Sequence, residues 1–321
     1  MPAAPRMDPP PGMTALEVPA KFVVPPPAAS ADILMSDGAP IRLRRYGAGP
    51  VRLMLSHGNG LAINAYLPFW EPLGESFELV AFDIRNHGEN PPHDPHRHTW
   101  PRITRDIEEI FHATQTAFGE KPTVGVFHSL SAVATLLNAV EGGPPWSALA
   151  LFDPPIFPPP NQAVHAVQMA EKEQLTLRAS ARPVAYRTPE AFAAQLKQRR
   201  AFARFVDGEH LLFAQSTLRP LPTGEWGLRC PRNLEAFIFD TNDDPTLWGK
   251  LKRLKMPVIL IGADPDLPDA GAPARICHAV HEDTGINYTI IRDTTHFLQV
   301  EHPRACREAL TAFLQGCNLA P

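Results

Sequence analysis

The sequence predicts an α/β fold, in which a mostly parallel central sheet is flanked by helices and interrupted by an inserted helical lid. Three observations support this. Short apolar runs of strand length recur along the chain, amphipathic stretches of helical spacing separate them, and the alternation stops from about residue 154 to residue 255 before it resumes. We therefore divide the 321 residues into a proline-rich N-terminal arm (1–30), a core (31–153 and 256–321) and the lid (154–255).

Six apolar runs have the length and the flanking turns of buried strands. They cover residues 51–56, 78–82, 123–127, 148–152, 258–261 and 288–291. Between the second and third runs, isoleucine and phenylalanine recur at helical spacing over 103–118, which predicts a helix with one face packed on the sheet. Segments 131–140 and 303–314 predict two more helices, and the first of them ends at a Glu-Gly-Gly-Pro-Pro stop.

The two remaining segments depart from this alternation. Residues 1–30 hold nine of the 37 prolines but neither a basic start nor an apolar run of roughly 7–15 residues, so we expect an extended arm rather than a signal peptide. Residues 154–255 open on Pro-Pro-Ile-Phe-Pro-Pro-Pro and contain scattered aromatic rings among helical patches. An apolar lid of this kind favours a small hydrophobic substrate.

Composition excludes several classes of partner. Lys and Arg number 30 against 34 Asp and Glu, a formal net charge of −4, so no basic surplus is present to bind nucleic acid. No apolar run approaches the roughly 18 residues of a membrane span. The four cysteines lack Cys-x-x-Cys spacing, and nothing indicates export, so we expect neither disulfides nor a zinc site and a cytoplasmic location.

A cluster of histidines, His93, His96 and His98 with Asp94, is spaced like a metal site. Its loop is broken by prolines and gives the side chains no fixed ligand geometry. We therefore expect a solvated loop and no bound metal.

Ser129 is the residue that most strongly indicates chemistry. It follows an apolar strand and directly precedes a helix, so its hydroxyl would stand above the sheet near the first helical amides. An ordinary helix-capping serine is the alternative. Residues 127–131, Phe-His-Ser-Leu-Ser, resemble the nucleophile elbow of the α/β-hydrolase fold family, usually G-x-S-x-G. Ser131 is a mild change from glycine, whereas Phe127 places a ring where the turn usually requires a bare backbone.

Other segments resemble further motifs of the same family, in the same order. His-Gly-Asn-Gly at 57–60 resembles its H-G-x loop, which implies that the amides of Asn59 and Leu130 form an oxyanion hole. Residues 83–88 resemble its D-x-R-x-H-G stretch, to which we assign a bracing role. His296 lies after the last strand and before the last helix, where the family keeps its histidine.

The acid that would orient His296 has three candidates. Family order places it between the serine and the histidine. Asp264 and Asp266 follow the run 258–261, while Asp153 follows the run 148–152 and precedes two prolines that would fix its direction. We select Asp153 and keep Asp266 and Asp264 as alternatives.

The resemblance implies a serine hydrolase that cleaves a carboxylic ester or related acyl compound through an acyl-enzyme. Ser129 would attack the carbonyl carbon, and His296 would act as base and then as acid, with no cofactor. Thioester, lactone or carbon–carbon bond hydrolysis and cofactor-free perhydrolysis use the same residues and stay open. A non-catalytic small-ligand receptor is the alternative from another class, and Phe127 favours it. The sequence predicts no oligomeric state.

Overall fold

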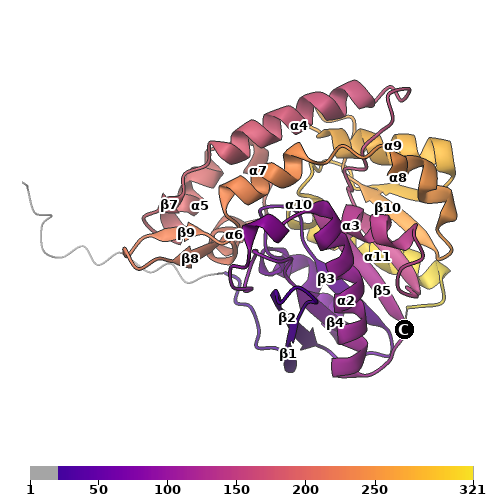
Figure 1. Ribbon diagram of the computed structural model, residues 1–321, viewed down its shortest axis with the longest axis horizontal. Helices are drawn as coiled ribbons and strands as arrows, with labels where there is room; N and C mark the ends of the chain where they lie inside the picture. The colour runs from indigo at the N-terminus through magenta and orange to yellow at the C-terminus, as the bar shows by residue number, and fades with distance from the viewer. Residues whose placement is uncertain (1–20, 321) are drawn as a thin grey trace, which may run out of the picture.

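The computed structural model describes residues 21–320, so most of the expected arm lies outside the described residues. Its centre is an eight-stranded sheet with the order β1-β2-β4-β3-β5-β6-β10-β11 (Figure 1). The strands are β1 (Ala29–Leu34), β2 (Pro40–Tyr46), β3 (Arg52–Ser56), β4 (Glu78–Phe82), β5 (Thr123–His128), β6 (Ala148–Phe152), β10 (Val258–Gly262) and β11 (Asn287–Ile290).

The six apolar runs all form strands, and the pairs from β4 through β3, β5, β6 and β10 to β11 are parallel. The predicted α/β class with a mostly parallel sheet is confirmed. The sequence did not predict β1 and β2, which pair antiparallel with each other, as β2 does with β4. Strand β1 alternates half-buried and exposed residues, so it shows no continuous apolar run.

Helices cover both faces of the sheet because successive strand residues point to opposite sides. Leu53 and Leu55 of β3 lie in one core, together with residues of helices α1 (Leu67–Trp70) and α11 (Pro303–Gly316). Met54, between them in sequence, lies in the other core. That second core includes residues of α2 (Trp100–Phe118), α3 (Leu130–Ala139) and α9 (Ala272–Thr284). Three layers result, with the sheet in the middle.

Residues 154–255, which we name the insertion, connect β6 to β10. Its helices are α4 (His165–Ser180), α5 (Pro189–Lys197), α6 (Glu209–Thr217), α7 (Arg232–Asp240) and α8 (Thr246–Lys250). It also contains a three-stranded antiparallel sheet of β7 (Ala185–Tyr186), β9 (Trp226–Leu228) and β8 (Leu218–Pro220), which a purely helical segment would lack. These strands are too short to leave an apolar run in the sequence.

The insertion packs over loops that follow the carboxyl ends of the central strands. Helices α4 and α7 run side by side above the sheet (Figure 1), and α6 packs on the short helix η1 (Ile63–Tyr66) that follows β3. Arg229 donates a hydrogen bond of 2.8 Å to the carbonyl of Gly88, after β4. Ligands of open α/β sheets bind at this end of the strands. Among the helices of residues 21–320, none is both long and apolar enough to cross a membrane.

Candidate active site

Ser129 occupies the turn between β5 and α3 with φ 54° and ψ −113°, a conformation that non-glycine residues adopt only when their surroundings enforce it. Its amide donates to the carbonyl of Phe152 at 3.0 Å. The Ser131 hydroxyl donates to the carbonyl of His128 at 2.9 Å and accepts from the amide of His128 at 3.1 Å. Ser131 therefore closes the turn at the position where the family motif has its second glycine.

Phe127 does not obstruct the turn, because its ring points into the core below Ser129. The ring is fully buried and packs edge-on against Phe82 and Trp146, with centroid distances of 6.1 and 5.6 Å. Gly125 leaves the space that the ring fills, since a Cβ at residue 125 would lie 2.6 Å from a ring carbon of Phe127. Phe127 takes part in sheet packing and leaves the hydroxyl of Ser129 open to His296.

The structure brings Ser129, His296 and Asp153 together from the ends of three strands. His296 Nε2 lies 3.0 Å from Ser129 Oγ, and His296 Nδ1 lies 2.7 Å from Asp153 Oδ2. Asp153 is fully buried, with φ 45°, and its Oδ1 accepts a hydrogen bond of 3.1 Å from the amide of Ala263. Because the carboxylate only accepts, Nδ1 carries the imidazole proton and Nε2 is left to accept the proton of the serine hydroxyl.

Asp264 and Asp266 lie apart from His296 and hold a neighbouring loop. Both accept hydrogen bonds from Arg292 Nη1, at 3.1 and 2.8 Å, and Asp264 Oδ2 also accepts from the amide of Asp293 at 3.1 Å. These contacts connect the loop after β10 to the loop after β11. Of the three candidate acids, Asp153 is the one that contacts the imidazole.

Electrostatics favour the protonated form of His296. Burial alone would lower the pKa of His296, but the hydrogen bond and the charge of Asp153 outweigh burial and raise the pKa above its usual value. The imidazole side chain stays 29% exposed. A histidine of this kind can take a proton from a hydroxyl and return it to a leaving group.

The two amides expected to form an oxyanion hole belong to Leu130, the successor of Ser129 in the chain, and to Asn59, in the loop after β3. The Asn59 loop approaches closely, since a Cβ on Gly58 would lie 3.1 Å from Ser129 Cβ. The flanking amides of Gly58 and Gly60 donate to side chains, but among residues 21–320 no group accepts from the amides of Asn59 or Leu130. Two free amides beside a serine hydroxyl can bind a developing oxyanion.

The stretch 83–88 braces this loop, as its position in the sequence suggested. Asp83 is buried and accepts from the amide of Ile63 at 2.8 Å, and His87 Nε2 accepts from the amide of Gly60 at 3.0 Å. Arg85 is fully buried between carboxylates. None of these side chains contacts Ser129 through a hydrogen bond within the described residues.

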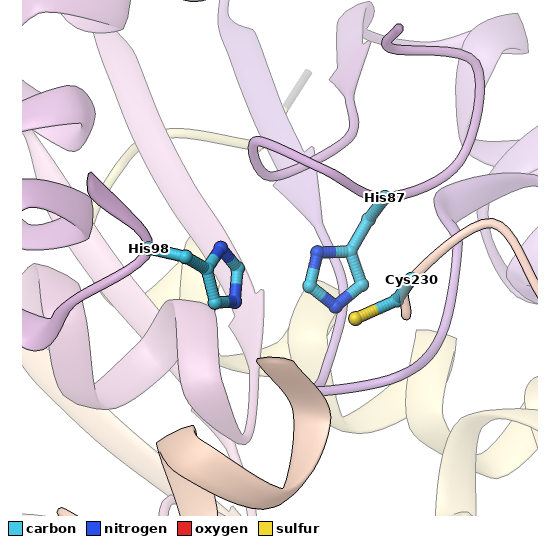
Figure 2. A group of neighbouring side chains, drawn as sticks. All are labelled: His87, His98 and Cys230. Atoms are coloured by element: carbon cyan, nitrogen blue, oxygen red, sulfur yellow. The ribbon is translucent and has the colours of Figure 1, made fainter. Parts of the chain in front are cut away.

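The expectation of a solvated loop over residues 93–98 is wrong for His98, which joins a different group. His98 is buried and faces His87 and Cys230 (Figure 2), with ligand atoms within 4.8 Å of one another. Sequence spacing gives no sign of this group, because Cys230 belongs to the insertion. A metal held there would have to take the lone pair of His87 Nε2 from the amide of Gly60. His93 and His96 lie outside the group.

Comparison with known proteins identifies the family. The model of the alpha/beta hydrolase family matches residues 53–309, most of the chain. The chain belongs to this family. All four cysteines of this hydrolase-fold protein fall within the described residues, and each is a free thiol.

Solved structures similar to this alpha/beta hydrolase family member share its fold at low sequence identity. E-2-(acetamidomethylene)succinate hydrolase is 19% identical, with a TM-score of 0.71 and coverage of 89% of this chain and 99% of its own. The thioesterase domain of the curacin biosynthetic pathway is 17% identical, with a TM-score of 0.67 and coverage of 88% and 99%. N-formylmaleamic acid deformylase from Pseudomonas putida S16 is 16% identical, with a TM-score of 0.61 and coverage of 88% and 100%.

Proposed function

We propose that this protein is a serine hydrolase that cleaves a carboxylic ester or related acyl compound through an acyl-enzyme intermediate. The observation that carries the proposal is the position of His296, whose two ring nitrogens contact Ser129 Oγ at 3.0 Å and Asp153 Oδ2 at 2.7 Å. A nucleophile, a base in hydrogen-bond contact with it and an acid that fixes the tautomer of the base are the three parts that acyl transfer requires.

In the proposed reaction, Ser129 Oγ forms a bond to the carbonyl carbon while its proton passes to His296 Nε2. The amides of Asn59 and Leu130 stabilise the oxyanion, where removal of one good donor costs about 2.7–4 kcal/mol in known enzymes. The bond to the leaving oxygen then breaks, and His296 returns the proton to that oxygen. A water molecule repeats the sequence on the acyl-enzyme, with His296 as base, and releases the carboxylic acid and free Ser129.

Aromatic packing beside the site supports an acyl group of small to medium size and apolar character. Phe297, the neighbour of His296, packs on three rings of the insertion, those of Phe202, Phe205 and Phe213, with centroid distances of 5.3, 5.4 and 6.5 Å. Insertion and core thus share one apolar cluster next to the histidine.

A thioester is the second candidate substrate class, favoured by the structural likeness to a thioesterase domain. The receptor alternative depended on Phe127, and the burial of that ring removes its support. The predicted cytoplasmic location and the predicted lack of nucleic-acid and membrane partners stay predictions.

The experiment that tests the proposal follows p-nitrophenyl esters of two to eight acyl carbons with wild type, Ser129→Ala and the exposed-site control Ser180→Ala. We expect kcat/KM to fall by at least about 10³ in Ser129→Ala and to stay within twofold of wild type in Ser180→Ala. A fluorophosphonate should label wild type stoichiometrically and leave Ser129→Ala unlabelled. Undiminished turnover in Ser129→Ala would contradict the proposed nucleophile. A folded wild type that turns over acyl thioesters alone would move the substrate class to thioesters.

A further inference from the structure

A chain of buried hydrogen bonds runs beneath Ser129 and takes no part in the reaction described above. The amide of Gly58 donates to Tyr66 Oη at 3.3 Å, and Tyr66 Oη lies 2.7 Å from His128 Nδ1. His128 Nε2 lies 2.9 Å from the carbonyl oxygen of His296. The chain thus connects the loop after β3, the residue before the nucleophile and the main chain of the proposed base.

The direction of every bond in this chain follows from its two ends. A carbonyl oxygen only accepts, so His128 Nε2 carries the hydrogen and donates it to His296. The neutral ring then has a lone pair on Nδ1, which accepts the Tyr66 hydroxyl hydrogen. The Tyr66 oxygen is left free to accept from the amide of Gly58. Each polar atom is satisfied in one arrangement.

Burial keeps the His128 ring neutral. His128 and Tyr66 are 1% and 3% exposed. Burial, followed by the charge of the neighbouring His296, holds the pKa of His128 well below its usual value. Two further ionisable groups lie close enough to act on the chain electrostatically, His57 on His128 and Glu209 on Tyr66.

The two histidine rings lie 4.7 Å apart between centroids, at 43° to each other. An uncharged ring at residue 128 does not oppose the imidazolium that forms on His296 during the proposed reaction. A cation in its place would oppose it, because two like charges at this distance repel each other strongly in a buried site.

We propose that His128 is a positioning residue that fixes the main chain of His296 and, through Tyr66, holds the base and the oxyanion loop in register. The inference rests on the proposed function for its effect on catalysis. The geometric basis is that one imidazole contacts both loops. Gly58 fits this arrangement closely, because a Cβ there would lie 3.0 Å from His128 Nδ1.

The expected effect follows from how little displacement catalysis tolerates. Thr295, the residue before His296, is held by the Glu301 carboxylate. Its amide donates to one carboxylate oxygen at 2.5 Å, and its hydroxyl donates to the other at 2.6 Å. The carbonyl of His296 itself is held by His128. A displacement of about 1 Å at a reacting group costs on the order of 10²-fold in rate. We therefore expect His128→Phe to lower kcat by about 10- to 100-fold, with KM within about threefold of wild type.

Three variants test the assignment. His128→Phe keeps a ring and removes both hydrogen bonds, and His128→Gln retains a donor that reaches the carbonyl of His296. Tyr66→Phe breaks the chain one step earlier. Tyr46→Phe is the matched control, because Tyr46 is a buried tyrosine that packs against Trp70, outside the hydrogen-bond chain. We expect the kcat of His128→Gln to stay within about fivefold of wild type. Tyr66→Phe should lower kcat, and Tyr46→Phe should leave it unchanged.

The second readout does not need a substrate. An NMR titration of histidine-labelled protein, with the His296 signal assigned from His296→Gln, follows the His296 pKa directly. In His128→Phe the looser contact with Asp153 should lower this pKa by about half a unit or more, and in His128→Gln the pKa should stay near that of wild type.

Two results would overturn the inference. One is a His128→Phe variant with the kcat and the His296 titration of wild type. The other is equal impairment of the Phe and Gln variants with unchanged His296 titration, which would indicate a packing role alone. If wild type hydrolyses no ester and Ser129 is not labelled, the proposed function fails, whereas the titration still supports or refutes the positioning of His296. If His128→Phe does not fold, His128→Gln and Tyr66→Phe carry the same comparison.

Discussion

Replacement of Asp153 by asparagine separates the three candidate acids. Asp153 Oδ2 accepts from His296 Nδ1 at 2.7 Å, and Oδ1 accepts from the amide of Ala263 at 3.1 Å. An asparagine has one accepting oxygen for these two donors. If that oxygen faced His296, the side-chain NH₂ group of the asparagine would face the backbone amide of Ala263. These two buried donors would then lack an acceptor, which costs about 1–3 kcal/mol. The favoured arrangement keeps the oxygen toward Ala263.

In that arrangement the asparagine NH₂ group faces His296 Nδ1, which must then accept. The imidazole proton moves to Nε2, where it blocks proton transfer from Ser129. The same wrong tautomer lowers kcat by about 10⁴ when the corresponding aspartate of a serine protease is replaced by asparagine. We expect a loss of about 10³- to 10⁴-fold in Asp153→Asn on an activated ester, with the fold intact by circular dichroism.

Asp264→Asn and Asp266→Asn are the matched controls, since both aspartates pair with Arg292 and neither contacts His296. They should stay within about threefold of wild type, as expected for partners of an exposed arginine. An Asp153→Asn variant within tenfold of wild type, together with a large loss in either control, would refute the assignment of the acid.

Three further predictions concern pH and packing. The pKa of His296 is raised, so kcat/KM should fall as the pH drops through a midpoint above 6.5, and the midpoint should move down in Asp153→Asn, as a pH–rate profile would measure. Burial raises the pKa of Glu209 well above 4.5, and neither of its carboxylate oxygens has a hydrogen-bond partner among residues 21–320. Wild type should therefore lose stability as the pH rises above 4.5 toward the folded-state pKa, and Glu209→Gln should remove this slope in urea titrations at several pH values. Gly125→Ala should destabilise the protein by about 1–3 kcal/mol in the same assay, with part of the loss recovered when Phe127→Leu is added.

The fold was predictable where burial leaves a continuous signal. Strands such as β6 (Ala148–Phe152) are buried along their whole length, and an apolar run marks each of them. Strand β1 pairs at the sheet edge with one side half exposed, and the short strands of the insertion are two or three residues long, so no run marks them. Local sequence patterns carry too little information to place such strands.

The geometry of the candidate site was predictable in part. Ser129 and His296 stand at strand ends in an order that the sequence displays. Among the aspartates, the two prolines after Asp153 favoured that residue, but Asp264 and Asp266 stayed open because all three follow apolar runs. In the structure Asp153 has φ 45°, and its carboxylate contacts the histidine. Phe127 suggested an obstacle, and the space that accommodates its ring is left by a glycine two residues earlier.

In the proposed reaction the loop of residues 57–60 binds the oxyanion, and the insertion helps to hold this loop. The amides of Gly58 and Gly60 donate to buried side chains of the core, and between them the side-chain amide of Asn59 donates to the carbonyl of Glu235, in α7 of the insertion, at 2.8 Å. The loop that carries the backbone amide of Asn59 is therefore held from both the core and the insertion. Because a fixed donor stabilises an oxyanion without reorganising during the reaction, displacement of α7 would weaken oxyanion binding even if Ser129, His296 and Asp153 kept their contacts.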